Sequence, residues 1–263
     1  TRRAEGIGYY GLSNNIASAI APALAIYLLN ITHNYNLLFW LAFLTSAIGL
    51  GINATLKLNP RELIKDKPKI SLDRFFLLKG WSEGVSMMCL SFSYGVTATY
   101  VAIYGKETLN ISGGSAVFFM LLSVGLILSR LVGSRTLRQG KITQNASVGI
   151  LISLCGYLMF ALLQNPIGYY GSAFIVGLGN GHMWPAYQTM FLNLAPHTQR
   201  GTANSSILIS WDIGVGLGTL IGGAIAEHCG YQQAFIASAL VNLIGIIIFF
   251  GYAKNDFLKN KLR

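Results

Sequence analysis

The sequence predicts an all-α polytopic membrane protein with about eight transmembrane helices. Only 11% of its 263 residues are charged, whereas a soluble domain carries roughly 25%. Hydrophobic residues make up 53% of the chain, and the mean hydropathy is +0.52. A spanning helix needs about 20 mostly apolar residues. Stretches without Lys, Arg, Asp or Glu reach that length at residues 6–56, 84–105, 108–129, 142–199 and 228–253.

Turn-forming residues divide the two longest stretches into pairs of helices. Asn30–Asn36 (NITHNYN) interrupts the first stretch, and Gln164–Gly168 (QNPIG) interrupts the fourth. Clusters of Asn, Pro and Gly are typical of turns rather than of helix interiors. The predicted helices therefore cover residues 9–29, 36–56, 82–103, 114–136, 144–164, 168–190, 203–226 and 231–253.

Basic residues indicate how these helices are oriented in the membrane. With this helix assignment, every Lys and Arg except Lys106 falls at the termini or in the loops 57–81, 130–143 and 191–202, which share one side. The positive-inside rule puts that side in the cytoplasm. We expect an integral protein of the bacterial inner (plasma) membrane with both termini cytoplasmic. The net charge of +10 then reflects loops next to the lipid bilayer, and no nucleic-acid partner is expected.

A weak internal repeat relates the two ends of the chain. Residues 3–25 align without a gap to residues 200–222, and both segments carry small residues at helical spacing. Small residues let spanning helices approach closely. Parallel repeats related by an axis along the membrane normal are typical of transporters.

Three segments resemble the major facilitator superfamily of secondary transporters. They are Arg3–Ser13 followed by Ala21-Pro22, Ser129–Gly133 continuing to Gly140-Lys141, and Arg200–Ser205 with Asp212–Gly218. The resemblance is greatest to the family's proton-driven drug- and sugar-efflux permeases. It implies a gating role for the residues that match these motifs: Arg130, Gly133, Arg138 and Gly140 in the basic loop, and Arg3, Arg200 and Gly201 at two helix starts.

The resemblance also implies a domain organisation and one departure from the family. The predicted helices correspond to the family's fifth to twelfth, which makes this a partial fold without the first four. Residues 1–56 would be the last two helices of the N-terminal half, 57–77 the cytoplasmic central loop, and 78–263 the C-terminal six-helix half. In the basic loop the family usually has an acid that holds a neighbouring helix end, and Leu137 stands at that place.

Asp212 is the leading candidate for coupling transport to protons. It is an acid in a run of small and apolar residues, about 14 Å into its predicted helix at about 1.5 Å per residue. An ionised Asp at the membrane midplane costs at least about 2.5 kcal/mol by insertion scales. Its counterpart in the repeat is Asn15, which is also polar. The alternative is that Asp212 only packs, through a hydrogen bond to a neighbouring helix.

His182 and Glu83 are further proton-coupling candidates. His182 lies in Gly177–Pro185 (GLGNGHMWP), where Gly and Pro weaken the helix, and broken spanning helices expose backbone groups near the midplane. It could exchange protons with Asp212 or bind substrate; close glycine packing with the imidazole satisfied by a neighbour is the alternative. Glu83 lies near the cytoplasmic end of its helix, where an interfacial ion pair with Lys79 is the alternative to a proton site.

Polar and aromatic residues on three predicted helices are candidates to line a substrate cavity. They comprise Asn15 on the first helix, Ser91 and Tyr94 on the third, and Asn180, Trp184, Tyr187 and Gln188 on the sixth. Residues three or four apart on a helix share a face, which groups positions 180, 184 and 187. Packing between helices is the alternative for the third helix.

The predicted function is secondary active transport, as proton-coupled efflux of a small molecule by alternating access. An inert or structural fragment that does not transport is one alternative. An intramembrane enzyme is disfavoured because the chain has no His-Glu-x-x-His or Gly-x-Ser-x-Gly motif. Cys89, Cys155 and Cys229 are expected to pack rather than form a disulfide framework. We expect no cofactor, no metal and no catalytic residue; the expected partners are a small-molecule substrate, a coupling proton and the bilayer.

Overall fold

A computed structural model describes residues 24–29, 31–56, 75–111 and 113–262, together with Ala17, Ala21 and Asp73. Within these residues the fold is helical throughout. Its long helices are α2 (Tyr35–Ala54), α3 (Trp81–Glu107), α4 (Gly114–Arg138), α5 (Ile142–Leu162), α6 (Pro166–Leu194), α7 (Arg200–Cys229) and α8 (Tyr231–Ile248). A π-helical turn, Phe249–Ala253, joins α8 to the short α9 (Lys254–Asn260). Short 3₁₀ helices precede α3 and α7, at Leu78–Gly80 and His197–Gln199.

The predicted all-α membrane fold is confirmed for the described part of the chain. By length and composition, the helices able to cross a bilayer are Tyr35–Ala54, Leu78–Glu107, Ile142–Leu162, His197–Cys229 and Tyr231–Asn260, with a shorter apolar helix at Gly114–Arg130. Each predicted helix from residue 36 onward coincides with an observed one. The predicted helix 9–29 lies mostly outside the described residues, although residues 24–29 are helical.

Local sequence explains several helix ends. Asn165 caps α6 because its side chain accepts a hydrogen bond from the Gly168 backbone N–H at 2.7 Å, and Pro166 opens the first turn. Both features are typical of a helix start. Between α7 and α8, Gly230 has a φ of +97°, a backbone conformation that favours glycine. The chain therefore reverses there with a single residue between two long helices.

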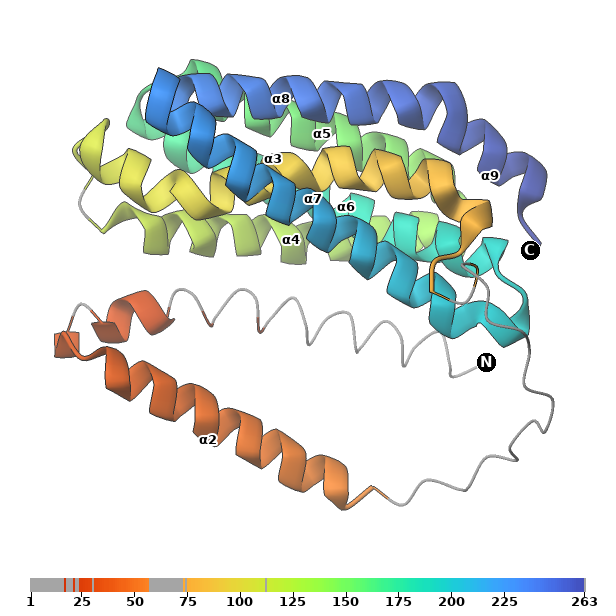
Figure 1. The fold of residues 1–263 in the computed structure, drawn as a ribbon, viewed down its shortest axis with the longest axis horizontal. Helices are drawn as coiled ribbons and strands as arrows, with labels where there is room; N and C mark the ends of the chain where they lie inside the picture. Colours follow the sequence, from red (N-terminus) through yellow and green to blue (C-terminus); the bar gives the residue numbers. More distant parts are fainter. Residues whose placement is uncertain are drawn as a thin grey trace.

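The helices α3–α8 form one bundle in which two sets of three interlock (Figure 1). The two sets are α3–α5 and α6–α8. In each set the first helix packs on the second and third helices of the other set: α3 contacts α7 and α8, and α6 contacts α4 and α5. Additional contacts join α5 to α8 and α7 to α8. In Figure 1, α2 lies apart from this bundle, and none of its residues is buried.

Glycines bring α3 and α7 into backbone contact. A side chain added at Gly214 would meet Met88 and Ser91, and one added at Gly218 would meet the Phe92 carbonyl. The predicted small-residue stripe of residues 200–222 is therefore the face of α7 that packs on α3. Glycine-mediated approach is a common way for membrane helices to pack.

Close approach at glycines also holds α6 between α4 and α5. Gly177 lies against the Leu122 backbone of α4, and Gly179 lies against the Ser153 backbone of α5. Since both crossings fall near the middle of α6, this helix has no room for larger side chains on either flank.

A ladder of polar contacts fixes α3 against α8. Three rungs follow the antiparallel pair in order, each ending on a backbone carbonyl: Ser86 Oγ to Gly245 at 2.9 Å, Asn242 Nδ2 to Leu90 at 3.4 Å, and Ser93 Oγ to Ser238 at 2.6 Å. Buried polar groups of spanning helices need such partners. The ladder fixes the register of α3 on α8.

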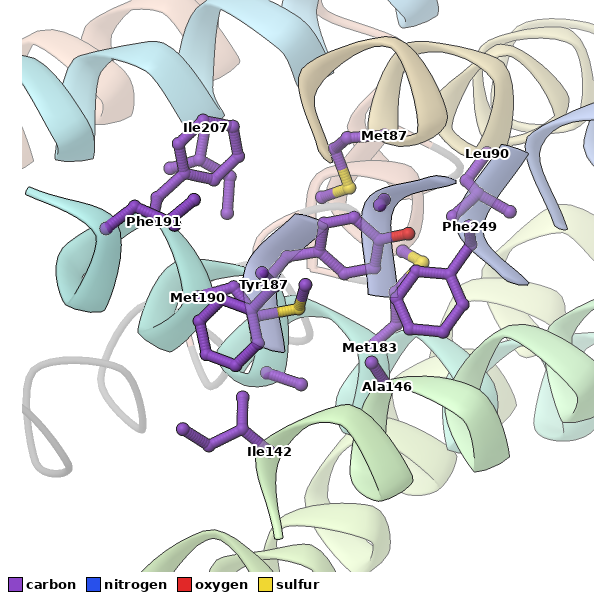
Figure 2. Close-up of a cluster of buried hydrophobic side chains, with 14 of the residues drawn as sticks. Met87, Leu90, Ile142, Ala146, Met183, Tyr187, Met190, Phe191, Ile207 and Phe249 are labelled. Atoms are coloured by element: carbon purple, nitrogen blue, oxygen red, sulfur yellow. The ribbon is translucent and has the colours of Figure 1, made fainter. Parts of the chain in front are cut away.

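Apolar side chains fill the bundle in two clusters. One includes Met87, Tyr187, Phe191 and Phe249, from α3, α6 and the π-helical turn. Met87, Tyr187 and Phe249 gather at its centre, and Phe191 lies beside Ile207 (Figure 2). The other gathers aromatic residues near the opposite ends of the helices, among them Tyr104 and Phe160. Within the first cluster the Tyr187 hydroxyl is not left unpaired, because it contacts Ser86 Oγ at 2.7 Å.

We expect Gly218→Ala to destabilise the bundle, whereas Gly216→Ala on the same helix does not. A methyl group at 218 overlaps the α3 backbone, while nothing lies within 4 Å of the corresponding position at 216. Overpacking typically costs about 1–3 kcal/mol, and an exposed helical Gly→Ala change gains up to about 1 kcal/mol. Thermal unfolding in detergent measures both. Equal effects of the two variants would contradict the proposed crossing.

Candidate functional site

Asp212 lies on the exposed face of α7, about 18 Å from the start of that helix at about 1.5 Å per residue. The opposite face of α7, with Ser210 and Gly214, is buried against α3. Asp212 makes no hydrogen bond or ion pair to any residue that the structure describes. A packing role against the described helices therefore receives no support. Its repeat counterpart Asn15 lies outside the described residues.

Beside Asp212, an aromatic bridge of Tyr94, Trp211 and Trp184 connects three helices. The rings of Tyr94 on α3 and Trp211 on α7 are 5.2 Å apart, and Trp184 on α6 lies edge-on to Trp211 at 5.1 Å. All three residues are partly exposed. Tyr94 and Trp184 are among the cavity residues predicted from sequence, whereas Trp211, which joins them, is not. The bridge presents aromatic faces and edges at the depth of Asp212.

Polar groups lie behind the aromatic bridge. Asn180 on α6 is 7% exposed, and the Tyr157 hydroxyl of α5 lies near both Asn180 and Tyr94. This hydroxyl is buried. From the helix ends, Tyr94 and Asn180 each lie about 20 Å deep at about 1.5 Å per residue. Aromatic and amide groups thus meet near the middle of the bundle.

The other cavity candidates have different surroundings. Ser91 and Tyr187 are fully buried: the Ser91 hydroxyl donates to the Met88 carbonyl at 3.1 Å, and Tyr187 pairs with Ser86. Gln188 is partly exposed and donates to the Asn204 side chain on α7 at 3.1 Å. The structure therefore brings Tyr94, Asn180, Trp184 and Gln188 toward one region and places Ser91 and Tyr187 in helix contacts.

His182 is held by two hydrogen bonds to Asn145 of α5. Its Nδ1 lies 2.9 Å from Asn145 Oδ1, and Asn145 Nδ2 donates to the His182 backbone carbonyl at 2.9 Å. Gly133 of α4 packs directly on the imidazole, since a Cβ there would lie 2.6 Å from His182 Nδ1. Asn145 is not among the site residues predicted from sequence. Nδ1 of the imidazole is thus satisfied by a neighbour, and no hydrogen bond to Asp212 is formed.

Glu83 is fully buried at the start of α3. Ser82 Oγ donates to its Oε2 at 3.1 Å, and its Oε1 has no hydrogen-bond partner among the described residues. Lys79 is exposed, so the ion pair expected from sequence as one reading of Glu83 is not formed. The likewise acidic Asp256 of α9 lies within electrostatic range. The Glu83 carboxyl group is therefore buried with a hydrogen-bond partner on only one of its two oxygens among the described residues.

The motif residues of the basic loop lie at the end of α4. Arg130 is partly buried, Gly133 is buried against His182, and Gly140 has a φ of +76° just after the helix. Arg138 is the last residue of α4. Leu137, where the family usually has an acid, packs against the apolar cluster that contains Tyr187.

The remaining gating candidates lie at helix starts. Arg200 is the first residue of α7, and its Nε is buried without a hydrogen bond among the described residues. Gly201 is exposed with open space around it. Arg3 lies outside the described residues.

Comparison with known proteins links this arrangement to transporters. The chain is 21% identical over 262 residues to the staphylopine export protein of Staphylococcus aureus, covering 94% of this chain and 65% of that protein. It is 25% identical over 168 residues to an uncharacterised MFS-type transporter of Burkholderia mallei, covering 63% of this chain and 40% of that one. The chain thus spans less than two thirds of these relatives.

Solved structures share the fold. A bacterial homologue of the human lysosomal transporter Spinster, in an inward-facing and occupied conformation, superposes with a TM-score of 0.65 at 16% identity, over 99% of this chain and 71% of that one. The peptide transporter POT in complex with sulfate gives 0.60 at 16% identity, over 70% and 39%.

The family assignment follows from a match to the sequence profile described as Major Facilitator Superfamily, over residues 1–214 and 146–261. The predicted resemblance is thereby confirmed. The chain belongs to the Major Facilitator Superfamily.

Proposed function

We propose that the protein is a secondary active transporter that exports a small organic molecule by alternating access, in exchange for protons. The observation that carries this proposal is the exposed carboxylate of Asp212, at mid-depth on α7, beside the aromatic bridge of Tyr94, Trp211 and Trp184. Family membership and the similarity to an export protein support transport and its outward direction.

The position of Asp212 requires either water or a proton. An ionised Asp facing hydrocarbon costs at least about 2.5 kcal/mol, and ionisable residues in spanning helices usually face a cavity or a partner. The α7 face that packs on α3 excludes Asp212. A carboxyl that alternates between its protonated and ionised forms as the cavity opens to each side would couple proton entry to substrate exit.

The surroundings of Asp212 favour a substrate with a cationic group and a flat or apolar part. An ionised carboxylate attracts a cation, and the faces of Trp and Tyr bind cations and stack on flat groups. The buried Asn180 amide and Tyr157 hydroxyl add hydrogen-bonding groups at the same depth. Staphylopine, the solute in the name of one relative, serves as the first probe.

A domain organisation follows from the same proposal. Residues 78–263 supply the C-terminal half, which contains the observed bundle α3–α8, and residues 1–56 belong to the N-terminal half. Residues 57–77 connect them on the cytoplasmic side. The exposed face of α7 would then form one wall of a cavity between the halves.

Two other functions are weaker. An enzyme would need a nucleophile–base pair or a metal cluster; the described residues hold no group of three or more His, Cys, Asp or Glu able to bind a metal, and the relatives named above are transporters. The second alternative is a structural protein that does not transport, and it would show no substrate flux. Flux through vesicles that contain the full-length protein separates this alternative from the proposal.

Asp212→Asn is expected to abolish pH-gradient-driven efflux from vesicles while leaving substrate exchange intact. The amide keeps the size and polarity of the side chain but cannot carry a proton. Glu227→Gln is the matched control, because Glu227 is an exposed acid on the same helix, close to its end. Unchanged gradient-driven efflux in Asp212→Asn would overturn the coupling role.

Trp211→Ala is expected to weaken substrate binding roughly two- to tenfold, because an aromatic contact contributes about 0.5–1.5 kcal/mol. Trp211→Phe should recover most of this affinity. Trp81 is 56% exposed at the start of α3, so Trp81→Ala serves as the control. Isothermal titration calorimetry with staphylopine as the first probe measures all three variants. Equal loss in both Ala variants would contradict a specific role for the bridge.

Glu83→Gln is expected to leave the stability of the protein unchanged or higher. Burying an ionised carboxylate costs several kcal/mol, and this one has an oxygen without a partner. Glu83→Ala should instead lower stability by about 2 kcal/mol, because it leaves a cavity. Thermal unfolding compares them. Strong destabilisation by Gln would show that an ionised and paired carboxylate is needed.

A further inference from the structure

Asn145 fixes the orientation and the tautomer of His182. The His182 backbone carbonyl can only accept a hydrogen bond, so the group of Asn145 that faces it must be the Nδ2 donor. The other end of the amide, Oδ1, then faces His182 Nδ1 at 2.9 Å and can only accept. His182 must therefore carry a hydrogen on Nδ1.

The second ring nitrogen is left as the basic site. With Nδ1 protonated, the lone pair of the neutral imidazole lies on Nε2. Nε2 has no hydrogen-bond partner among the described residues. His182 is 9% exposed and Asn145 is 2% exposed, so their packing holds the ring in place. A proton added to His182 goes to Nε2.

A proton on Nε2 is expected to affect the contact between α4 and α6, because a charged residue lies nearby. Arg130 of α4 is a charged neighbour of His182, and α5 contributes the neutral Asn145. Arg130 begins the basic loop, and Gly133, one turn further on, touches the imidazole. A second positive charge here opposes the guanidinium in a medium that screens weakly. We expect this repulsion to loosen the contact between the Arg130 end of α4 and α6.

We propose that the His182–Asn145 pair is a proton-dependent link between the middle of the bundle and the basic loop, in which Asn145 is the positioning residue and Nε2 of His182 binds the proton. His182 lies two residues from both Asn180 and Trp184 on α6, while its ring touches Gly133 of the loop. The pair thus connects both regions physically. Its use in gating rests on the proposed transport function, but its chemistry does not.

The tautomer is tested by NMR on the full-length protein with ¹⁵N-labelled histidine. The sequence has four histidines, and the signals of His182 are those lost in His182→Gln. Long-range ¹H–¹⁵N correlation is expected to show the Nδ1–H form in the wild type and in Asn145→Asp, which keeps an acceptor oxygen. Asn145→Leu removes the acceptor and should give a mixture of tautomers.

An Nε2–H form in the wild type, or an unchanged tautomer in Asn145→Leu, would overturn the positioning role. If the Leu variant does not fold, the wild-type tautomer still decides between the two outcomes. Neither measurement needs substrate or a pH gradient. Failure here is therefore distinguishable from failure of the transport proposal.

The link to the loop is tested by thiol labelling at Gln139, an exposed residue in the turn after α4. The labelling rate of Gln139→Cys, in a background without the native cysteines, is divided by that of Gln164→Cys, an exposed position in the loop before α6. The ratio corrects for the pH dependence of thiol reactivity. It is expected to rise at least about fivefold as His182 is protonated, the lower end of usual coupling factors.

The pH-dependent rise in the labelling ratio should be absent in His182→Gln. In Asn145→Asp the midpoint of this rise should move to higher pH, because a carboxylate favours the imidazolium. A ratio that does not change with pH in the wild type would overturn the link. A rise that persists in His182→Gln would do the same, because it would assign the proton to another group.

Discussion

Close backbone contact through glycine is the constraint on which this bundle depends. Helices in a bilayer gain little from the hydrophobic effect, so they must touch over a large area to associate. Gly214 and Gly218 bring α7 onto α3, and Gly177 and Gly179 place α6 between α4 and α5. The contact fixes which face of each helix is inside. On α7 it leaves the face with Asp212 free of the other described helices.

Polar residues in this setting divide into three physical situations. The Ser93 hydroxyl and the His182–Asn145 pair are paired where helices approach closely, and they hold the packing together. Glu83 is buried with one oxygen unpaired. Asp212 is exposed at mid-depth, where an ionised group needs water. Exposure at mid-depth suits Asp212 to contact with substrate or protons, so it remains the leading coupling candidate.

Hydropathy and turn chemistry allowed the helices from residue 36 onward to be predicted with small errors at their ends. The helix predicted at 82–103 covers Trp81–Glu107, because Lys106 and Glu107 extend the last turn beyond the uncharged stretch. The site was less predictable because it depends on contacts between distant helices. Asn145 is an ordinary polar residue until α5 places it on His182, and Trp211 gains its role only where α3, α6 and α7 meet. Ser91 and Tyr187 look like cavity residues in sequence but point into helix contacts.

The central claim is that Asp212 faces a water-filled cavity that opens to each side of the membrane in turn. The most direct test is labelling of Asp212→Cys by a membrane-impermeant thiol reagent, added to either side of sealed vesicles, after Cys89, Cys155 and Cys229 have been replaced. Labelling from both sides is the expected result. Labelling from neither side would place residue 212 against lipid or protein and contradict the account.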